Sequence, residues 1–306
     1  MNYISDTFTT KDGVNLATYF WECENPKGII HIVHGMSEHA GRYDEFALKM
    51  NQFGYLVFAS DIRGHGKTAG AIDKVGELAM QDGWKKVIGD VWELTKMLDV
   101  KYPKLPLVLF AHSMGSFIVR ELSFSNPPEV NAYIYSGTAG HPGLLGTVGL
   151  KLAKLNVKLM GKKNRTGMMT QLVFGDNNKR IENKRTIKDW LSKDEAIVDA
   201  YINDPYCMQI FTSQFYTDLL TGILYVNETI NIRKMNPNKP ILLFAGDMDP
   251  VGDYGAGPTE VFGKFKKAGV KDVTLKIYKG GRHEMINETN REEVYGMIIE
   301  WLDSKI

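Results

Sequence analysis

Short, mainly apolar runs alternate with helix-like segments along the first half of the chain. The runs lie at Gly28–His34, Tyr55–Ala59, Leu107–Ala111 and Ala132–Tyr135. Each run is about the length of one strand and is rich in apolar residues, as is typical of strands buried on both faces of a sheet. We therefore predict four strands here, in addition to a hairpin at the N-terminus.

Helical patterns separate these runs. They cover residues 43–53, 82–100 and 117–124, with the clearest apolar spacing of three and four in the second. At the N-terminus, Ile4–Thr9 and Val14–Trp21 flank a Lys-Asp-Gly turn signal, which predicts an antiparallel hairpin. Strands that alternate with helices indicate a parallel sheet with helices on both faces. The predicted fold class is therefore α/β.

The pattern changes in the middle of the chain. Residues 138–237 hold helical patterns but no convincing buried strand. Two further apolar runs follow at Ile241–Ala245 and Val273–Tyr278, and residues 291–304 have the pattern of a closing amphipathic helix. We therefore predict one α/β core into which a helical unit is inserted, with the core made of residues 1–137 and 238–306 and the insertion of residues 138–237.

Composition and charge exclude several classes of protein. The 306 residues have a formal net charge of +1, so nothing indicates bulk electrostatic binding to nucleic acid. No apolar run approaches the roughly 20 residues needed to span a bilayer, and the N-terminus lacks the apolar segment of a signal peptide. Cys23 and Cys207 form neither a metal-ligand spacing nor a disulfide framework. We therefore expect a cytoplasmic protein with two reduced cysteines.

The third apolar run leads into a candidate nucleophile. It continues as Ala-His-Ser-Met-Gly, from Ala111 to Gly115, between the predicted strand and the next helix. A serine at the tip of a strand–turn–helix motif, with small residues two positions away on either side, is typical of a nucleophile elbow. Larger neighbours would collide with the strand and the helix. Ser113 is therefore the candidate nucleophile, with Ala111 where the motif usually has glycine.

A serine nucleophile needs a base within hydrogen-bond reach and an acid that orients the base. In folds with this elbow both follow the serine, the acid first and the histidine second. Only His141 and His283 follow Ser113. His141 has no strand before it, whereas His283 comes shortly after a predicted strand, at the sheet edge where catalytic groups converge. We therefore predict His283 as the base.

The acid should come directly after the Ile241–Ala245 run. The segment Gly-Asp-Met-Asp-Pro, which begins at Gly246, offers Asp247 and Asp249, with Asp253 as a more distant candidate. One carboxylate would accept a hydrogen bond from the imidazole, and the other would form the turn. The pattern of residues alone does not separate Asp247 from Asp249.

An acyl transfer to Ser113 also requires hydrogen-bond donors for the oxyanion of the tetrahedral intermediate. One donor should be the backbone N–H of Met114, at the start of the helix after the serine. The second should come from the loop after Gly28–His34, where the N–H of Met36 is best placed. Both donors are backbone groups, so the two methionine side chains can line a pocket.

Four segments of the chain resemble one known group of enzymes. They read HGMSEHAGRY from His34, GYxV…DxRGHG from Gly54, HSMG from His112 and LKIYKGGRH from Leu275. These segments are similar to the monoacylglycerol lipase and lysophospholipase group, which consists of serine hydrolases of the α/β-hydrolase fold related to the serine aminopeptidase S33-like hydrolases. The resemblance covers most of the two core portions and is weak in the insertion, which corresponds to the lid of those enzymes.

The resemblance implies roles for individual residues. The acid of that group follows its strand as Gly-x-x-Asp, which implies Asp249. The oxyanion donors of the group correspond to Met36 and Met114. Glu38, His39 and Arg42 match the group's pattern beside the oxyanion loop, and we expect them to hold that loop. Ala111, in place of glycine, is a small departure that leaves the chemistry intact.

Residues 143–165 combine an apolar stripe with a basic one. Apolar residues recur at helical spacing, and so do Lys151, Lys154, Lys158 and Lys162, while no acidic residue occurs from Gly137 to Gly175. A basic amphipathic helix can lie on an anionic membrane surface. The alternative is a lid helix that covers the active site. Both can hold for a lipase that takes its substrate from a bilayer.

We therefore expect a carboxylic ester hydrolase that acts on lipid-like small molecules, either monoacylglycerols or lysophospholipids. Ser113, Asp249 and His283 would act through an acyl-enzyme, which requires no cofactor or metal. The alternatives are a small-ester carboxylesterase, an amide or peptide hydrolase on the same scaffold, and a receptor that retains the fold. Membrane contact would be peripheral, through the lid. The sequence gives no indication of the oligomeric state.

Overall fold

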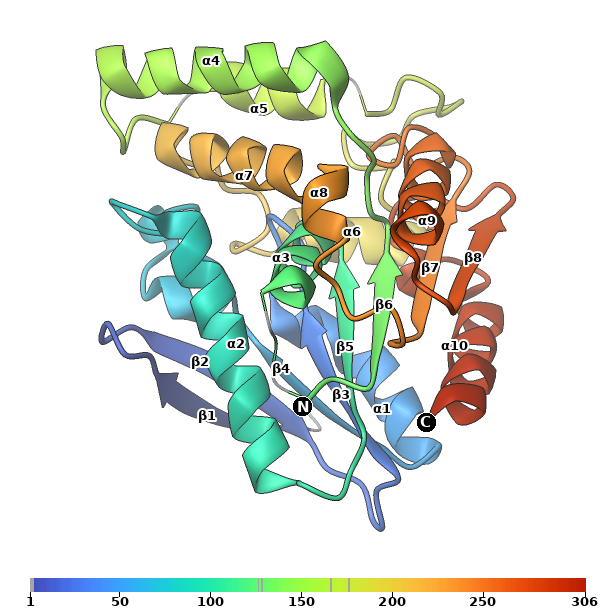
Figure 1. Ribbon diagram of the computed structural model, residues 1–306. Coiled ribbons are helices and arrows are strands. Elements are labelled where there is room, and N and C mark those ends of the chain that lie inside the picture. Colours follow the sequence, from blue (N-terminus) through green and yellow to red (C-terminus); the bar gives the residue numbers. More distant parts are fainter. Residues whose placement is uncertain (1–2, 126, 128, 166, 176) are drawn as a thin grey trace.

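Eight strands form one sheet at the centre of the molecule (Figure 1). The structure is a computed structural model that describes residues 3–125, 127, 129–165, 167–175 and 177–306, with only the backbone of residues 172–174. The strands follow the order β1-β2-β4-β3-β5-β6-β7-β8, and those from β3 to β8 are parallel. They are β1 Ile4–Thr9, β2 Asn15–Trp21, β3 Gly28–Val33, β4 Tyr55–Ser60, β5 Leu107–His112, β6 Ala132–Ser136, β7 Ile241–Gly246 and β8 Val273–Tyr278.

The strand predictions are confirmed to within one residue at each end. The hairpin of β1 and β2 is antiparallel and joins the edge of the sheet at β4. The central strand β5 lies between β3 and β6, and it sends Leu109 and Phe110 into apolar clusters on opposite faces. Because both faces of β5 are covered, every position favours an apolar residue, which explains a run without alternation.

Helices cover both faces of this sheet. The helices α1 (Asp44–Gln52) and α10 (Arg291–Lys305) pack on one face. The other face carries α2 (Gly83–Lys101), α3 (Met114–Phe124) and α9 (Ala256–Ala268). Helix α9 was not predicted; a glycine and a proline lie in its first turn. Short 3-10 helices lie at Ala40–Tyr43, Gly66–Ala69, Ile72–Lys74 and Met285–Asn287. The predicted α/β class, with helices on both faces, is confirmed.

The chain between β6 and β7 forms further helices beyond the carboxyl ends of the parallel strands (Figure 1). They are α4 Gly143–Met160, α5 Gly167–Phe174, α6 Glu195–Asn203, α7 Ser213–Val226 and α8 Thr229–Ile232. The buried Arg120 of α3 donates hydrogen bonds to the carbonyl oxygens of Ala139 and Val226 and to Asn227 Oδ1. One guanidinium of the core therefore holds both the start and the end of this helical region.

The apolar stripe of α4 is mostly exposed and does not form the contact of this helix with its neighbour α7. Helix α4 packs on α7 through small residues, because its buried positions include Gly146, Gly149 and Ala153. The leucines lie on a different side, and Leu144 and Leu159 are 85% and 70% exposed. Leu145 and Val148 of this stripe line a cavity that also borders Ser113, whereas Leu152, Leu155 and Leu159 border a separate groove. Among the described residues, no helix has both the length and the apolar character needed to cross a bilayer.

Candidate active site

Ser113 occupies a strained turn between β5 and α3. Its backbone φ and ψ are 50° and −118°, a conformation that non-glycine residues rarely adopt. The N–H of Ser113 donates to the carbonyl oxygen of Ser136, which fixes the turn against β6. A Cβ atom at Gly115 would lie 2.1 Å from the carbonyl oxygen of Val33, so only glycine fits there. The predicted strand–turn–helix motif around Ser113 is therefore present.

The structure brings His283 and Asp249 together from the loops after β8 and β7. The distance between His283 Nδ1 and Asp249 Oδ2 is 2.9 Å, and the two residues are 3% and 0% exposed. The other carboxylate oxygen of Asp249 accepts from the N–H of Val251 at 2.9 Å. Asp247 instead accepts from the N–H of Gly280 at 2.6 Å and closes the turn between the two loops. Asp249, and not Asp247, is thus the aspartate in hydrogen-bond contact with the imidazole of His283.

The surroundings of His283 set its protonation. Burial alone would lower the pKa of His283, but the carboxylate of Asp249 favours the imidazolium, and the pKa is raised above its ordinary value. The neighbouring ring of His112 lies 4.7 Å away, and burial lowers the pKa of His112 to about 4. His112 is therefore neutral at neutral pH and adds no positive charge beside His283.

In the loop after β3, hydrogen bonds fix both the N–H and the carbonyl oxygen of Gly35. The N–H of Gly35 donates to Glu38 Oε1 at 2.6 Å, and the carbonyl oxygen of Gly35 lies 2.7 Å from His34 Nδ1. The other ring nitrogen of His34 accepts from the N–H of Ile62, so Nδ1 carries the proton. Burial lowers the pKa of His34 to about 3, which agrees with a neutral ring. The peptide that leads into Met36 is therefore fixed.

Arg42 links this loop to the residue after His283. It donates to Glu38 Oε2 at 2.9 Å and to both carboxylate oxygens of Glu284 at 2.8 and 2.7 Å. Burial would raise the pKa of Glu284, but Arg42 lowers it to about 2. These contacts confirm the expectation that Glu38 and Arg42 hold the loop, whereas His39, for which the same role was expected, bonds Asp204 through Nε2. The contact with Glu284, which couples the two loops, was not predicted.

Replacing Arg42 with methionine should destabilise the fold by about 3–5 kcal/mol, because two buried carboxylates would lose their partner. Urea unfolding followed by tryptophan fluorescence measures this loss. The control is Arg291→Met, which removes a guanidinium that also contacts two carboxylates, Glu45 and Asp194, but at a more solvated site. That change should cost about 1 kcal/mol or less per pair. Equal losses for the two variants would contradict the proposed difference in burial.

Two cavities meet at Ser113. The smaller one has a volume of about 180 Å³ and is bordered by Ser113, His283 and the charged residues Glu38, Lys188 and Glu284. The larger one, of about 690 Å³, is lined mainly by apolar side chains, namely Met36, Met114, Phe117, Leu145, Val148, Leu219, Leu220, Ile223 and Val251. The predicted residues Met36 and Ser113 border both cavities. A substrate bound at Ser113 can therefore extend in two directions with different surroundings.

Several cavity residues come from the inserted segment and were not predicted. Lys188, Trp190 and Tyr201 border the smaller cavity. The ammonium of Lys188 lies 5.9 and 5.4 Å from the ring centres of Trp190 and Tyr201. No motif in the sequence marks these positions. Among the described residues, those that could together hold a metal ion are His39, Asp204 and Cys207.

The chain is similar to ester hydrolases along nearly its whole length. The family model described as serine aminopeptidase, S33 matches residues 24–290. The monoacylglycerol lipase of Mycolicibacterium smegmatis is 26% identical over 303 residues, which are 98% of this chain and 97% of that protein. The human monoglyceride lipase is 27% identical over 285 residues, which cover 90% of this chain and 82% of that protein.

A solved structure supports the same relationship. The crystal structure of a highly thermostable carboxyl esterase from Bacillus coagulans superposes with a TM-score of 0.92 at 30% identity, and covers 100% of this chain and 99% of that one. The agreement includes the sheet and the helices on both of its faces. The chain thus belongs to the serine aminopeptidase S33 family, and it is an ester hydrolase of the α/β-hydrolase fold that is similar to monoacylglycerol lipases.

Proposed function

We propose that Ser113, His283 and Asp249 form a catalytic triad that cleaves carboxylic esters through an acyl-enzyme. The observation that carries this proposal is the strained turn of Ser113 at the same small cavity as His283, whose ring is bonded to a buried aspartate. Backbone strain of this kind is typical of functional sites. The order serine, aspartate, histidine along the chain is the one found in this fold.

The roles follow from the chemistry of each group. Ser113 Oγ attacks the ester carbonyl while His283 Nε2 takes its proton, and Nδ1–H remains bonded to Asp249. His283 then gives that proton to the oxygen of the leaving alcohol. In the second half of the reaction, His283 takes a proton from water while the water attacks the acyl-enzyme. This step releases the acid and restores Ser113. Asp249 stabilises the imidazolium that forms in each half.

The backbone N–H groups of Met114 and Met36 serve as oxyanion donors in this proposal. Met114 is the first residue of α3, so its N–H has no partner within the helix and lies at the positive end of the helix dipole. Met36 follows Gly35, whose peptide groups are held by Glu38 and His34. A fixed donor needs no reorganisation when charge develops on the substrate oxygen.

The activity should fall at acid pH with a midpoint above the ordinary histidine value. The base must be neutral to accept the Ser113 proton, and Asp249 raises the pKa of His283. Protonation therefore inactivates the enzyme as pH falls through this raised pKa. The kcat/KM of a soluble ester, measured across pH 5 to 9, gives the midpoint. In Asp249→Asn the residual activity should have a lower midpoint, and an unchanged midpoint would contradict the role of Asp249.

The two cavities support a lipid-like ester as substrate. In this proposal the acyl chain occupies the larger, mainly apolar cavity and the alcohol occupies the smaller one with Glu38, Lys188 and Glu284. Such an arrangement suits a monoacylglycerol or a lysophospholipid. Relatives that are named monoacylglycerol lipases support the same choice. The likeness to a carboxyl esterase favours a second candidate function, the hydrolysis of small esters.

A series of p-nitrophenyl esters from C2 to C16 separates these two functions. Each buried methylene contributes about 0.8 kcal/mol, so kcat/KM should rise roughly fourfold per methylene until the larger cavity is full. Monoacylglycerols and lysophospholipids of the best chain length then identify the alcohol. A maximum at C2, followed by a steady decline, would favour the small-ester esterase.

We also propose that residues 138–237 act as the lid and that α4 contacts an anionic lipid surface. The leucines Leu152, Leu155 and Leu159 form an exposed apolar stripe, and they border an open groove between α4 and α5 together with Met168. Lys151, Lys154 and Lys158 are exposed beside this stripe. An apolar face flanked by lysines is suited to the boundary between headgroups and acyl chains.

Replacing Lys151, Lys154 and Lys158 with glutamine should weaken binding to anionic vesicles by roughly 100-fold at low salt, since each lysine near the surface contributes about 1 kcal/mol. Vesicle sedimentation measures the binding. The control variant changes Lys266, Lys267 and Lys271, which are exposed at the end of α9 and just after it. Hydrolysis of a soluble short-chain ester should be unchanged in both variants. Equal vesicle binding by wild type and the α4 variant would exclude this surface.

A further inference from the structure

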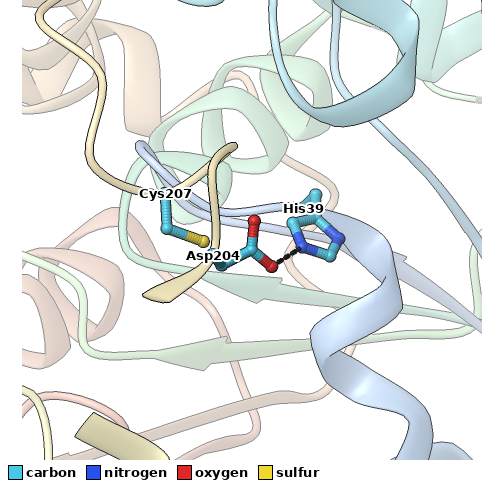
Figure 2. Close-up of side chains that lie close together, drawn as sticks. All are labelled: His39, Asp204 and Cys207. Atoms are coloured by element: carbon cyan, nitrogen blue, oxygen red, sulfur yellow. Dashed lines mark hydrogen bonds and ion pairs between the residues drawn. The ribbon is translucent and has the colours of Figure 1, made fainter. Parts of the chain in front are cut away.

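Three side chains with different ligand atoms meet beside the smaller cavity. His39 lies in the segment after β3, and Asp204 and Cys207 lie between α6 and α7 (Figure 2). One ligand atom from each residue lies within 4.8 Å of the other two. His39 Nε2 is 2.8 Å from Asp204 Oδ2, and the sulfur of Cys207 points toward the same carboxylate (Figure 2).

We propose that His39, Asp204 and Cys207 form an inhibitory site for Zn²⁺ or Cd²⁺. An imidazole nitrogen, a carboxylate oxygen and a thiolate are the ligands that Zn²⁺ takes in tetrahedral sites, with water in the fourth position. Mg²⁺ and Ca²⁺ prefer oxygen ligands and do not match this set. When the ion binds, it replaces the hydrogen bond between His39 Nε2 and Asp204 Oδ2. His39 then coordinates through Nε2 as a neutral ring with its proton on Nδ1, and Cys207 releases its thiol proton to solvent.

The surrounding contacts orient the ligands. The N–H of Tyr206 donates to Asp204 Oδ1 at 2.8 Å, which leaves Oδ2 directed at His39. The N–H of Cys207 donates to the carbonyl oxygen of Asp204 at 3.1 Å. Contacts of this kind hold metal ligands in place and add to affinity. The side chains of His39 and Asp204 are 17% and 26% exposed, and Cys207 borders the smaller cavity, so an ion can enter from solvent.

An ion at this site would join two segments that both border the cavity of Ser113. The hydroxyl of Ser37 already donates to the carbonyl oxygen of Cys207, and both residues line the smaller cavity. The cation would add bonds between the oxyanion loop and the segment of Asp204 and Cys207. It would thereby restrict the passage of alcohols into and out of the cavity, which lowers ester turnover until a chelator removes the ion.

Cadmium absorption tests the site directly. On titration with Cd²⁺ the wild type should gain a thiolate-to-metal charge-transfer band in the ultraviolet that saturates at one ion per chain. Cys207→Ser should lose this band, whereas Cys23→Ser should keep it, because the sequence has only these two cysteines. His39→Gln retains the thiol, and its affinity for Cd²⁺ should fall at least about tenfold. Thermal melting of each variant shows whether it is folded.

The band does not depend on ester turnover, so it tests the metal site even if the proposed triad is wrong. A wild type without the band, or a band that persists in Cys207→Ser, would overturn the site. Zn²⁺ should also inhibit hydrolysis of p-nitrophenyl butyrate by the wild type and by Cys23→Ser, with reversal by EDTA, and should inhibit His39→Gln much less. Equal inhibition of His39→Gln, or a bound ion that leaves turnover unchanged, would overturn the inhibitory role.

Discussion

Ser113→Ala should abolish ester hydrolysis, with a loss of about 10⁴ to 10⁶ in kcat, because the acyl-enzyme can no longer form. The change removes one oxygen atom. Two hydrogen bonds of the turn do not involve that oxygen: the N–H of Ser113 donates to the Ser136 carbonyl oxygen, and the hydroxyl of Ser116 donates to the Ser113 carbonyl oxygen. The melting temperature should therefore stay close to that of the wild type.

Hydrolysis of p-nitrophenyl butyrate and thermal melting measure these two expectations together. Ser125→Ala is a matched control, because Ser125 follows the last residue of the same helix, is exposed, and donates its hydroxyl proton to the Glu121 carbonyl oxygen of that helix. This variant should retain the activity of the wild type. Activity of Ser113→Ala within about tenfold of the wild type would end the proposal of a serine nucleophile.

Asp249→Asn should reduce kcat by roughly 10⁴, the effect expected when the acid can no longer hold the imidazole in its reactive tautomer. The amide has nearly the shape of the carboxylate. It can no longer stabilise the imidazolium of His283, which Asp249 contacts at 2.9 Å in a fully buried position. The loss should appear in kcat more than in KM, because Asp249 acts on the transition state and not on the bound ester.

Asp247→Asn is the matched control for this prediction. Asp247 lies two residues earlier, and its carboxylate accepts from the N–H of Gly280. The asparagine can still accept this hydrogen bond through its side-chain oxygen, so the rate should change little. If the two substitutions had reversed effects, Asp247 would be the acid and the orientation of the loop after β7 would be wrong.

Much of the fold could be predicted from the apolar pattern alone. Strands such as β5 and β7 are buried on both faces, so they read as short apolar runs. Helix α9 was missed because Gly257 and Pro258 in its first turn resemble a loop signal. Its burial against the sheet through Val261 and Phe265 outweighs this local preference.

Few residues were candidates for the catalytic site. The steric requirements of the elbow select Ser113, and the order of acid and histidine along the chain limits the choice of the other two residues. The choice between Asp247 and Asp249 needed the resemblance to a family, since two residues in one turn have similar local preferences. The contact between Arg42 and Glu284, 242 residues apart, has no local signal in the sequence. It depends on two loops that meet only after the sheet has formed.

The leucine stripe of α4 is a second feature whose packing the sequence pattern did not determine. The sequence shows that the stripe exists but not which side of the helix packs. In the structure the contact with α7 goes through Gly146, Gly149 and Ala153, because small residues let two helices approach closely. The larger leucines are left exposed beside that contact. Size, and not hydrophobicity, decides the packed face here.

Covalent labelling with a fluorophosphonate tests the central claim most directly, because the reagent phosphonylates a serine that is activated by its base, and fluoride leaves. Intact-mass and peptide analysis should show one adduct per chain, on the peptide that contains Ser113, with parallel loss of esterase activity. Ser113→Ala should gain no adduct, and His283→Gln should react much more slowly. An active enzyme that gains no adduct, or one labelled at a residue other than Ser113, would contradict the account.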